Sequence, residues 1–119
     1  KRKAAGSIIG NWTSATVSTE WSYLDWPVSS ADLEKLRGVR FVFTSGSHAL
    51  EIDGVELLEN GKVIARDRHA GLAGKPSRGN FYKLSLPKGI HANNGCSLRA
   101  RVRSVGGKSS NGKLELIKE

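Results

Sequence analysis

Hydrophobic and polar side chains alternate along most of this chain. In the segment VRFVFTS, Val39, Phe41 and Phe43 fall on one side and the intervening residues on the other. In CSLRARVRSV, the even-numbered residues from Cys96 to Val102 are apolar, and arginines recur between them. A period of two places successive side chains on opposite faces of a β-strand, so both segments are predicted to be strands with one buried face.

Turn residues separate these segments. Asn60-Gly61 joins two apolar runs, and both residues tolerate the positive φ of a tight hairpin turn. Only SSADLEKLRG, residues 29–38, fits a helix, which Ser29 or Ser30 can cap and Gly38 can end. Roughly six to eight short strands and one short connecting helix predict an all-β protein, an antiparallel β-sandwich or jelly roll.

The length of 119 residues is that of one domain. Residues 1–10 are interpreted as a frayed or linker segment, and residues 11–119 as a single β-sandwich domain excised from a larger enzyme. The formal net charge of +8 suits contact with an anionic partner. Cys96 is the single cysteine, so no intrachain disulfide is expected. No run approaches the roughly 20 apolar residues of a membrane helix, and no membrane partner is predicted.

The stretch RDRHAGLAGKPSRGNFY, residues 66–82, has the composition of a phosphate-binding loop. That loop requires Gly, four residues, then Gly-Lys-Ser or Gly-Lys-Thr at the start of a helix. Here His69 stands where the first glycine should be, and Pro76 stands where the hydroxyl residue should be. A strand pattern follows instead of a helix, so nucleotide binding is rejected.

Asp67 and His69 are two residues apart, so on a strand they point the same way. Two ligands are too few for a zinc site, but a structural calcium could use oxygens of Glu51, Asp53 and Asp67. Alternatively, Asp67 and His69 lie at the rim of the core and hydrogen-bond backbone groups of the glycine loop, while Arg68 faces solvent. The residues alone leave both a structural role and a ligand contact open.

A sugar site needs an aromatic platform for the apolar face of a pyranose and planar polar groups for its hydroxyls. Phe81 follows the glycine loop, and several polar side chains lie close to it in sequence. The candidate ligand-binding residues are therefore Arg68, His69, Arg78, Asn80 and Phe81. Trp21 and Trp26 are interpreted as core residues rather than platforms.

Three arginines form a second candidate surface. Arg99, Arg101 and Arg103 fall on one face of their strand, with guanidinium groups about 7 Å apart. One interpretation is a solvated outer sheet face. The other is a surface for the sulfate, sialate or uronate groups of an anionic glycan, which arginine binds through two parallel hydrogen bonds. No nucleic-acid motif is present and aromatics are not interleaved with these arginines, so nucleic acid is not a predicted partner.

Four motifs occur in order along the chain. They are Thr44-Ser45-Gly46 with Asp53-Gly54-Val55, Asp67-x-His69-x-Gly71-x-x-Gly74, Asn80 before an aromatic residue, and Gly106-Gly107-x-x-Ser110-x-Gly112. This series resembles the β-sandwich accessory domains of secreted bacterial glycoside hydrolases, and is most similar to those that follow family 20 hexosaminidase catalytic modules. The resemblance covers roughly residues 12 to 117 and implies a galactose-binding-like jelly roll. Many such domains bind sugars, whereas others only brace the catalytic module.

The predicted function is a non-catalytic carbohydrate-binding module of a secreted glycoside hydrolase, with weak glycan binding through loops. The alternative is a structural brace with no ligand of its own. The expected partners are a glycan, neutral or anionic, and a neighbouring catalytic domain of the same polypeptide. The expected location is outside the cytoplasm: secreted, periplasmic or at the cell surface. Catalysis by this chain is not expected, because neither a supported carboxylate pair nor a nucleophile motif is recognisable.

Overall fold

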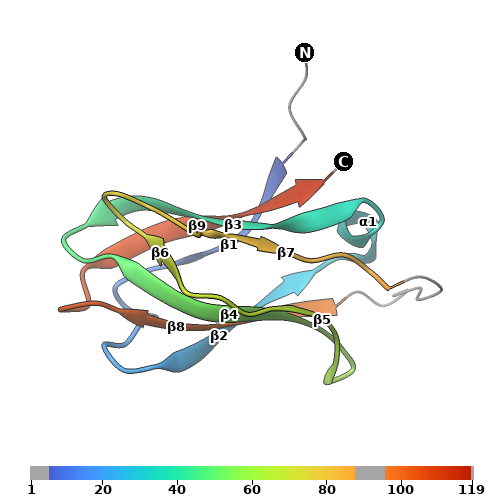
Figure 1. The fold of residues 1–119 in the computed structure, drawn as a ribbon, viewed down its shortest axis with the longest axis horizontal. Coiled ribbons are helices and arrows are strands. Elements are labelled where there is room, and N and C mark those ends of the chain that lie inside the picture. Colours follow the sequence, from blue (N-terminus) through green and yellow to red (C-terminus); the bar gives the residue numbers. More distant parts are fainter. Residues whose placement is uncertain (1–5, 88–95, 119) are drawn as a thin grey trace, which may run out of the picture.

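The protein folds into two antiparallel β-sheets that pack face to face (Figure 1). The computed structural model describes residues 6–87 and 96–118. The elements in these residues are β1 (Gly6–Trp12), β2 (Ser22–Val28), α1 (Ser30–Leu33), β3 (Leu36–Gly46), β4 (Leu50–Glu59), β5 (Lys62–Asp67), β6 (Gly71–Ala73), β7 (Phe81–Lys83), β8 (Cys96–Ser104) and β9 (Ser110–Lys118). The architecture confirms the prediction of an all-β sandwich with one short helix.

Each sheet has a central strand from the C-terminal part of the chain. The four-stranded sheet has the order β1-β9-β3-β7, so β9 lies between β1 and β3. The five-stranded sheet has the order β2-β8-β4-β5, and β6 also pairs with β4. Strand β8 therefore lies between β2 and β4, and its outward side chains can reach those of both neighbours.

The alternating pattern is realised along the whole of β8. Its apolar positions from Cys96 to Val102 are buried, whereas the arginines between them are partly exposed. The Asn60-Gly61 hairpin is also confirmed, with φ of 53° and 80° at the two residues that join β4 to β5. Both features follow from local chemistry. Successive side chains of a strand point to opposite faces, and a two-residue turn with positive φ matches the twist of the strands that it joins.

Four aromatic rings join the two sheets in the core. The centroid of the Phe41 ring lies 6.0 Å from Trp12, 6.3 Å from Trp26 and 5.8 Å from Tyr82. None of the four residues is more than 8% exposed. The two indoles donate to protein acceptors, as buried indoles usually do: Trp12 to Ser110 Oγ at 3.0 Å and Trp26 to the Asn11 carbonyl at 2.9 Å. The prediction that Trp26 is a core residue is confirmed.

Helix α1 is shorter than the sequence predicts. The Ser29 side chain caps it by accepting from the Asp32 amide at 3.3 Å, but the helix ends at Leu33. The prediction that Gly38 ends it is wrong, because Gly38 lies inside β3. A Cβ at that position would lie 2.6 Å from the Phe81 ring, so the glycine makes room for an aromatic ring on the neighbouring strand. No helix in the described part of the chain is long and apolar enough to cross a membrane.

The folded domain begins earlier than the predicted boundary after residue 10. Strand β1 starts at Gly6 and pairs with β9, from Gly6 opposite Ile117 to Trp12 opposite Gly112. Ile9 packs against the core. A Cβ at Gly10 would lie within van der Waals overlap of the Trp26 indole, so a residue without a side chain is required there. Residues 1–5 lie outside the described residues.

Candidate functional site

The glycine-rich loop after β5 is held by its own side chains. Asp67 Oδ2 accepts from the Lys83 amide at 2.8 Å, and Asp67 Oδ1 lies 3.0 Å from His69 Nδ1. His69 Nε2 lies 2.9 Å from the Gly79 carbonyl. Both ring nitrogens thus face oxygen acceptors, and both bonds form together only when the imidazole is protonated. These contacts are those of the structural role foreseen for the Asp67–His69 pair at the rim of the core.

Tyr82 packs against the glycine-rich loop from the side of the core. Its side chain is fully buried, and its ring stacks on the His69 imidazole with a centroid distance of 4.0 Å and an interplanar angle of 7°. The Tyr82 hydroxyl donates to the His69 carbonyl at 2.9 Å. Burial raises the pKa of Tyr82, and the nearby charge of Asp67 raises it further. One face of the imidazole is therefore covered and both its nitrogens face protein oxygens, which leaves His69 little capacity for a ligand.

Asn80 and Phe81 are also engaged in the fold. Asn80 Nδ2 donates to the Phe41 carbonyl at 2.8 Å, and the Asn80 carbonyl accepts from the Phe41 amide at 3.0 Å. Phe81 lies on the outer face of the four-stranded sheet, with the Arg40 guanidinium 5.4 Å from its ring centroid. Residues that are adjacent in sequence thus face different sides of the sandwich, and Asn80 and Phe81 do not meet Arg68.

Arg78 lies in the glycine-rich loop and is held there by its backbone. Its backbone pairs with Leu72 through two hydrogen bonds, of 2.8 and 2.9 Å. Its side chain is exposed and lines a shallow hollow together with Glu51 and Gly79. Of the five residues predicted to bind one ligand, only Arg68 lies beside the second predicted surface, the arginine row of β8.

The arginine row lies on the outer face of the five-stranded sheet, as the period-two pattern predicts. Each arginine pairs with a carboxylate of a neighbouring strand, at 3.2 Å for Arg99–Asp25, 2.7 Å for Arg101–Asp53 and 2.7 Å for Arg103–Glu51. Arg66 of β5 forms a fourth ion pair on this face, with Glu56 at 3.2 Å. The row is therefore a charge-compensated surface and not a bare cationic stripe. This arrangement supports the solvated-face interpretation for the three arginines themselves.

Two aromatic residues lie on the same face. Trp21 is partly exposed, with the guanidinium groups of Arg101 and Arg103 4.6 and 4.7 Å from its ring centroid. The interpretation of Trp21 as a core residue is therefore wrong. Tyr23 is 60% exposed, and the Arg99 guanidinium lies 5.7 Å from its ring centroid. Arginine stacks on aromatic rings through cation–π contact, so the two sets of side chains hold each other in place.

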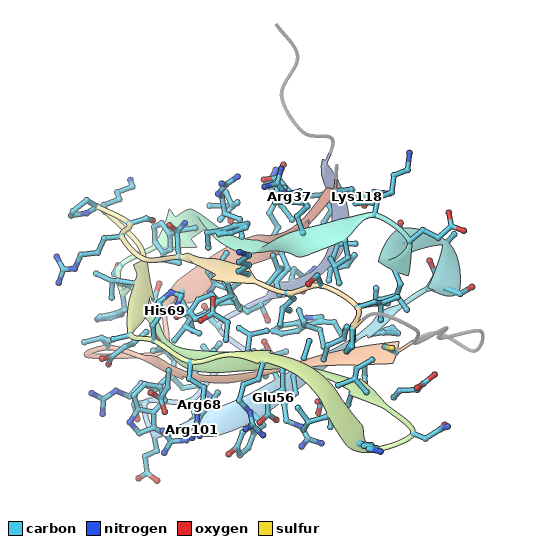
Figure 2. The ribbon with its side chains drawn as sticks, turned by 45° about the vertical axis from the view of Figure 1, so that its right-hand side comes forward. Arg37, Glu56, Arg68, His69, Arg101 and Lys118 are labelled. Atoms are coloured by element: carbon cyan, nitrogen blue, oxygen red, sulfur yellow. The ribbon has the colours of Figure 1, made fainter. Side chains whose placement is uncertain are left out.

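A shallow depression of about 40 Å³ lies in the middle of this face, over Gly54. Figure 2 shows Arg68, Arg101 and Glu56 together on this side of the molecule, with His69 between the two layers. The lining residues are Tyr23, Asp53, Gly54, Val55, Glu56, Arg68, Arg99 and Arg101. Gly54 has no side chain to fill the space, and a Cβ there would lie 3.2 Å from Arg68 Cγ. We define these eight residues as the Gly54 depression.

Neither Tyr23 nor Gly54 was predicted from the sequence to belong to a site. A signal for Tyr23 was present, because Tyr23 and Asp25 alternate with Leu24 and Trp26 and so share the outward face of β2. The position of Gly54 depends on the break in register between Ile52 and Gly54; a glycine within a strand pattern is a signal for such a break, but it does not show which side chains will face the glycine.

The carboxylates considered for calcium are engaged elsewhere. Glu51 and Asp53 pair with arginines, and Asp67 binds the Lys83 amide and His69. Residues 6–87 and 96–118 contain no group of three or more His, Cys, Asp or Glu side chains placed to hold a metal ion. No feature of the described residues therefore carries the calcium hypothesis.

A scan against protein-family models gives no match for this chain, and a search of curated proteins gives none either. The resemblance to accessory domains of glycoside hydrolases stays a prediction. Function is therefore inferred from the geometry of the Gly54 depression and its surroundings.

Proposed function

We propose that this chain is a non-catalytic β-sandwich module that binds a glycan on the outer face of its five-stranded sheet. The observation that carries the proposal is the exposed ring of Tyr23 at the edge of the Gly54 depression. The apolar face of a pyranose packs on such a ring, and its hydroxyls bind planar polar groups beside it. The proposed site thus lies on the sheet, whereas the sequence analysis placed it in the loops.

The polar groups around Tyr23 are already held in position. Arg101 and Asp53 are 2.7 Å apart, and Arg99 is bound by both Asp25 and the Tyr23 ring. Side chains that are fixed before binding lose less conformational entropy when a ligand arrives, so even a shallow surface can bind.

The parent protein and its location belong to the same proposal. They rest on the resemblance to accessory domains, which implies a secreted or cell-surface glycoside hydrolase with this module attached. The module would then hold the enzyme near its polymeric substrate, because a second binding event on one chain raises the effective concentration of the catalytic domain.

The test is an NMR titration of the domain with neutral oligosaccharides of glucose, xylose, galactose and N-acetylglucosamine, and with tetragalacturonate as an acidic oligosaccharide. We expect shifts at the amides of residues 22–25, 53–56 and 99–101. Tyr23→Ala should abolish them, and Tyr23→Phe should retain them because the ring is what stacks. Unchanged spectra with every sugar, or shifts confined to residues 69–80, would refute this site.

A second candidate is a structural module that packs against a neighbouring catalytic domain. It is favoured by the outer face of the four-stranded sheet, where Ile8 is 54% exposed and Phe81 lies under Arg40. In a polypeptide that carries both domains, Ile8→Lys is expected to lower the melting temperature of the catalytic domain while glycan binding stays unchanged. An unaltered melting temperature would argue against the brace.

A further inference from the structure

The outer face of the five-stranded sheet has one arginine more than it has carboxylates to pair with. Its four ion pairs are Arg66–Glu56, Arg99–Asp25, Arg101–Asp53 and Arg103–Glu51. Arg68 is the fifth arginine, and in the described part of the chain no carboxylate lies within ion-pair distance of it. Among the described residues of this face, five arginines against four carboxylates leave one positive charge on Arg68, which lines the Gly54 depression together with Arg99 and Arg101.

The stem of Arg68 lies over Gly54. A Cβ at residue 54 would lie 3.2 Å from Arg68 Cγ and 3.5 Å from its Cα, so the arginine passes close to the strand backbone. The residue is exposed and lies directly after the end of β5. A guanidinium placed in this way can present two parallel N–H groups to a planar anion.

The size of the depression limits what can enter it. A volume of about 40 Å³ is far below the roughly 300–1,000 Å³ of pockets that enclose a whole small-molecule ligand. A pyranose ring does not fit, but a single substituent of the sugar does. Asp53 and Glu56 also line the depression, and their charges are compensated by Arg101 and Arg66.

We propose that Arg68 binds the carboxylate of a uronic acid residue in the glycan, with that carboxylate seated in the depression and its sugar ring against Tyr23. This inference rests on the proposed function, since it names the substrate class for the same site. It differs from the sequence prediction, in which Arg99, Arg101 and Arg103 were the anion-binding residues. Those three are already paired, and Arg68 is the one left to bind an anion.

The experiment is isothermal titration calorimetry with tetragalacturonate and with its methyl ester, which has the same sugar ring without the charge. We expect wild type to bind the acid roughly tenfold or more tightly than the ester. Arg68→Gln should remove this preference, because it should weaken binding of the acid more than binding of the ester. Arg68→Lys should retain part of it, because the charge remains but the paired N–H groups are lost. Arg37→Gln is the matched control, since it removes the same charge from an exposed arginine on the opposite sheet (Figure 2).

The outcomes separate this inference from the proposed function. Equal binding of acid and ester by wild type, or equal losses in the Arg68 and Arg37 variants, would overturn the role of Arg68 while leaving the glycan site standing. Tighter binding of a sulfated keratan tetrasaccharide, which carries sulfates but no carboxylate, than of tetragalacturonate would overturn the assignment to a carboxylate. Absence of binding to these and to all neutral sugars would remove the proposed function and this inference together.

Discussion

Tyr82→Phe removes one oxygen atom from beneath the glycine loop and tests whether that loop is a structural element. The hydroxyl donates to the His69 carbonyl at 2.9 Å and lies 3.3 Å from the Ile52 carbonyl. Losing this bond at a buried site leaves the His69 carbonyl without the hydroxyl donor and costs about 1–3 kcal/mol. Unfolding entropy of about 2.1 cal/mol/K per residue, for 119 residues, converts this into a fall in Tm of about 4–12 °C.

The same variant predicts a pH effect with a definite sign. Burial, with Asp67 as a second cause, raises the pKa of Tyr82 in the folded protein above the value of about 10 for an unfolded chain. The folded state therefore keeps its proton while the unfolded state loses it. The contribution of the hydroxyl to the free energy of unfolding is therefore fully present below pH about 10. Above that pH the contribution falls by about 1.4 kcal/mol for each pH unit.

The assay is urea unfolding followed by tryptophan fluorescence at several pH values between about 8 and 11. The difference in unfolding free energy between wild type and Tyr82→Phe should be constant up to pH about 10 and shrink by about 1.4 kcal/mol at pH about 11. Tyr23→Phe is the matched control, because Tyr23 is 60% exposed and its variant should match wild type at every pH. A difference between wild type and Tyr82→Phe that does not change with pH would refute the assignment of a buried, protonated hydroxyl.

Three further predictions concern stability and reactivity. Asp67→Asn replaces one acceptor oxygen with a donor, so it should destabilise the fold by about 1–3 kcal/mol in urea unfolding. Hydrogen exchange of the Lys83 amide should become faster, and an unchanged exchange rate would contradict the role of Asp67 as its acceptor. Gly46→Ala should cost more than Gly61→Ala by at least about 1 kcal/mol in the same assay: both have positive φ, but a Cβ at Gly46 would overlap the backbone whereas Gly61 faces open space. Burial, with Glu59 as a second cause, raises the pKa of the Cys96 thiol, so iodoacetamide should label it quickly only after unfolding; rapid labelling of the folded protein would show that the thiol is accessible.

The predictable part of the fold came from features that act within a few residues. The alternation in β8 predicted which side chains are buried, because a strand turns successive residues to opposite faces whatever its partners are. Asn60-Gly61 predicted the hairpin for a similar reason. The contacts of Asp67 and His69 with the loop backbone were foreseen as one alternative, since polar backbone groups in a glycine loop need partners.

The predicted ligand set failed because it grouped residues by their distance along the chain. Arg68, Asn80 and Phe81 lie within a short stretch of sequence, yet they face three different parts of the sandwich. The actual neighbours of Arg68 at the Gly54 depression come from β2, β4 and β8, which are separated by tens of residues in the chain. No pattern within one segment reports which strands will be adjacent.

The sequence by itself determined the strands, the faces of those strands and one hairpin, since each depends on the chemistry of neighbouring residues. Only the tertiary structure decided the pairing of charges. The sequence shows an arginine row on β8, but strand order and register bring a carboxylate to each of its members. Within residues 6–87 and 96–118, the same register leaves Arg68 without a carboxylate partner, beside an exposed tyrosine and over a glycine. Charge compensation acts through space across strands, and for that reason the free arginine became visible only in the folded sheet.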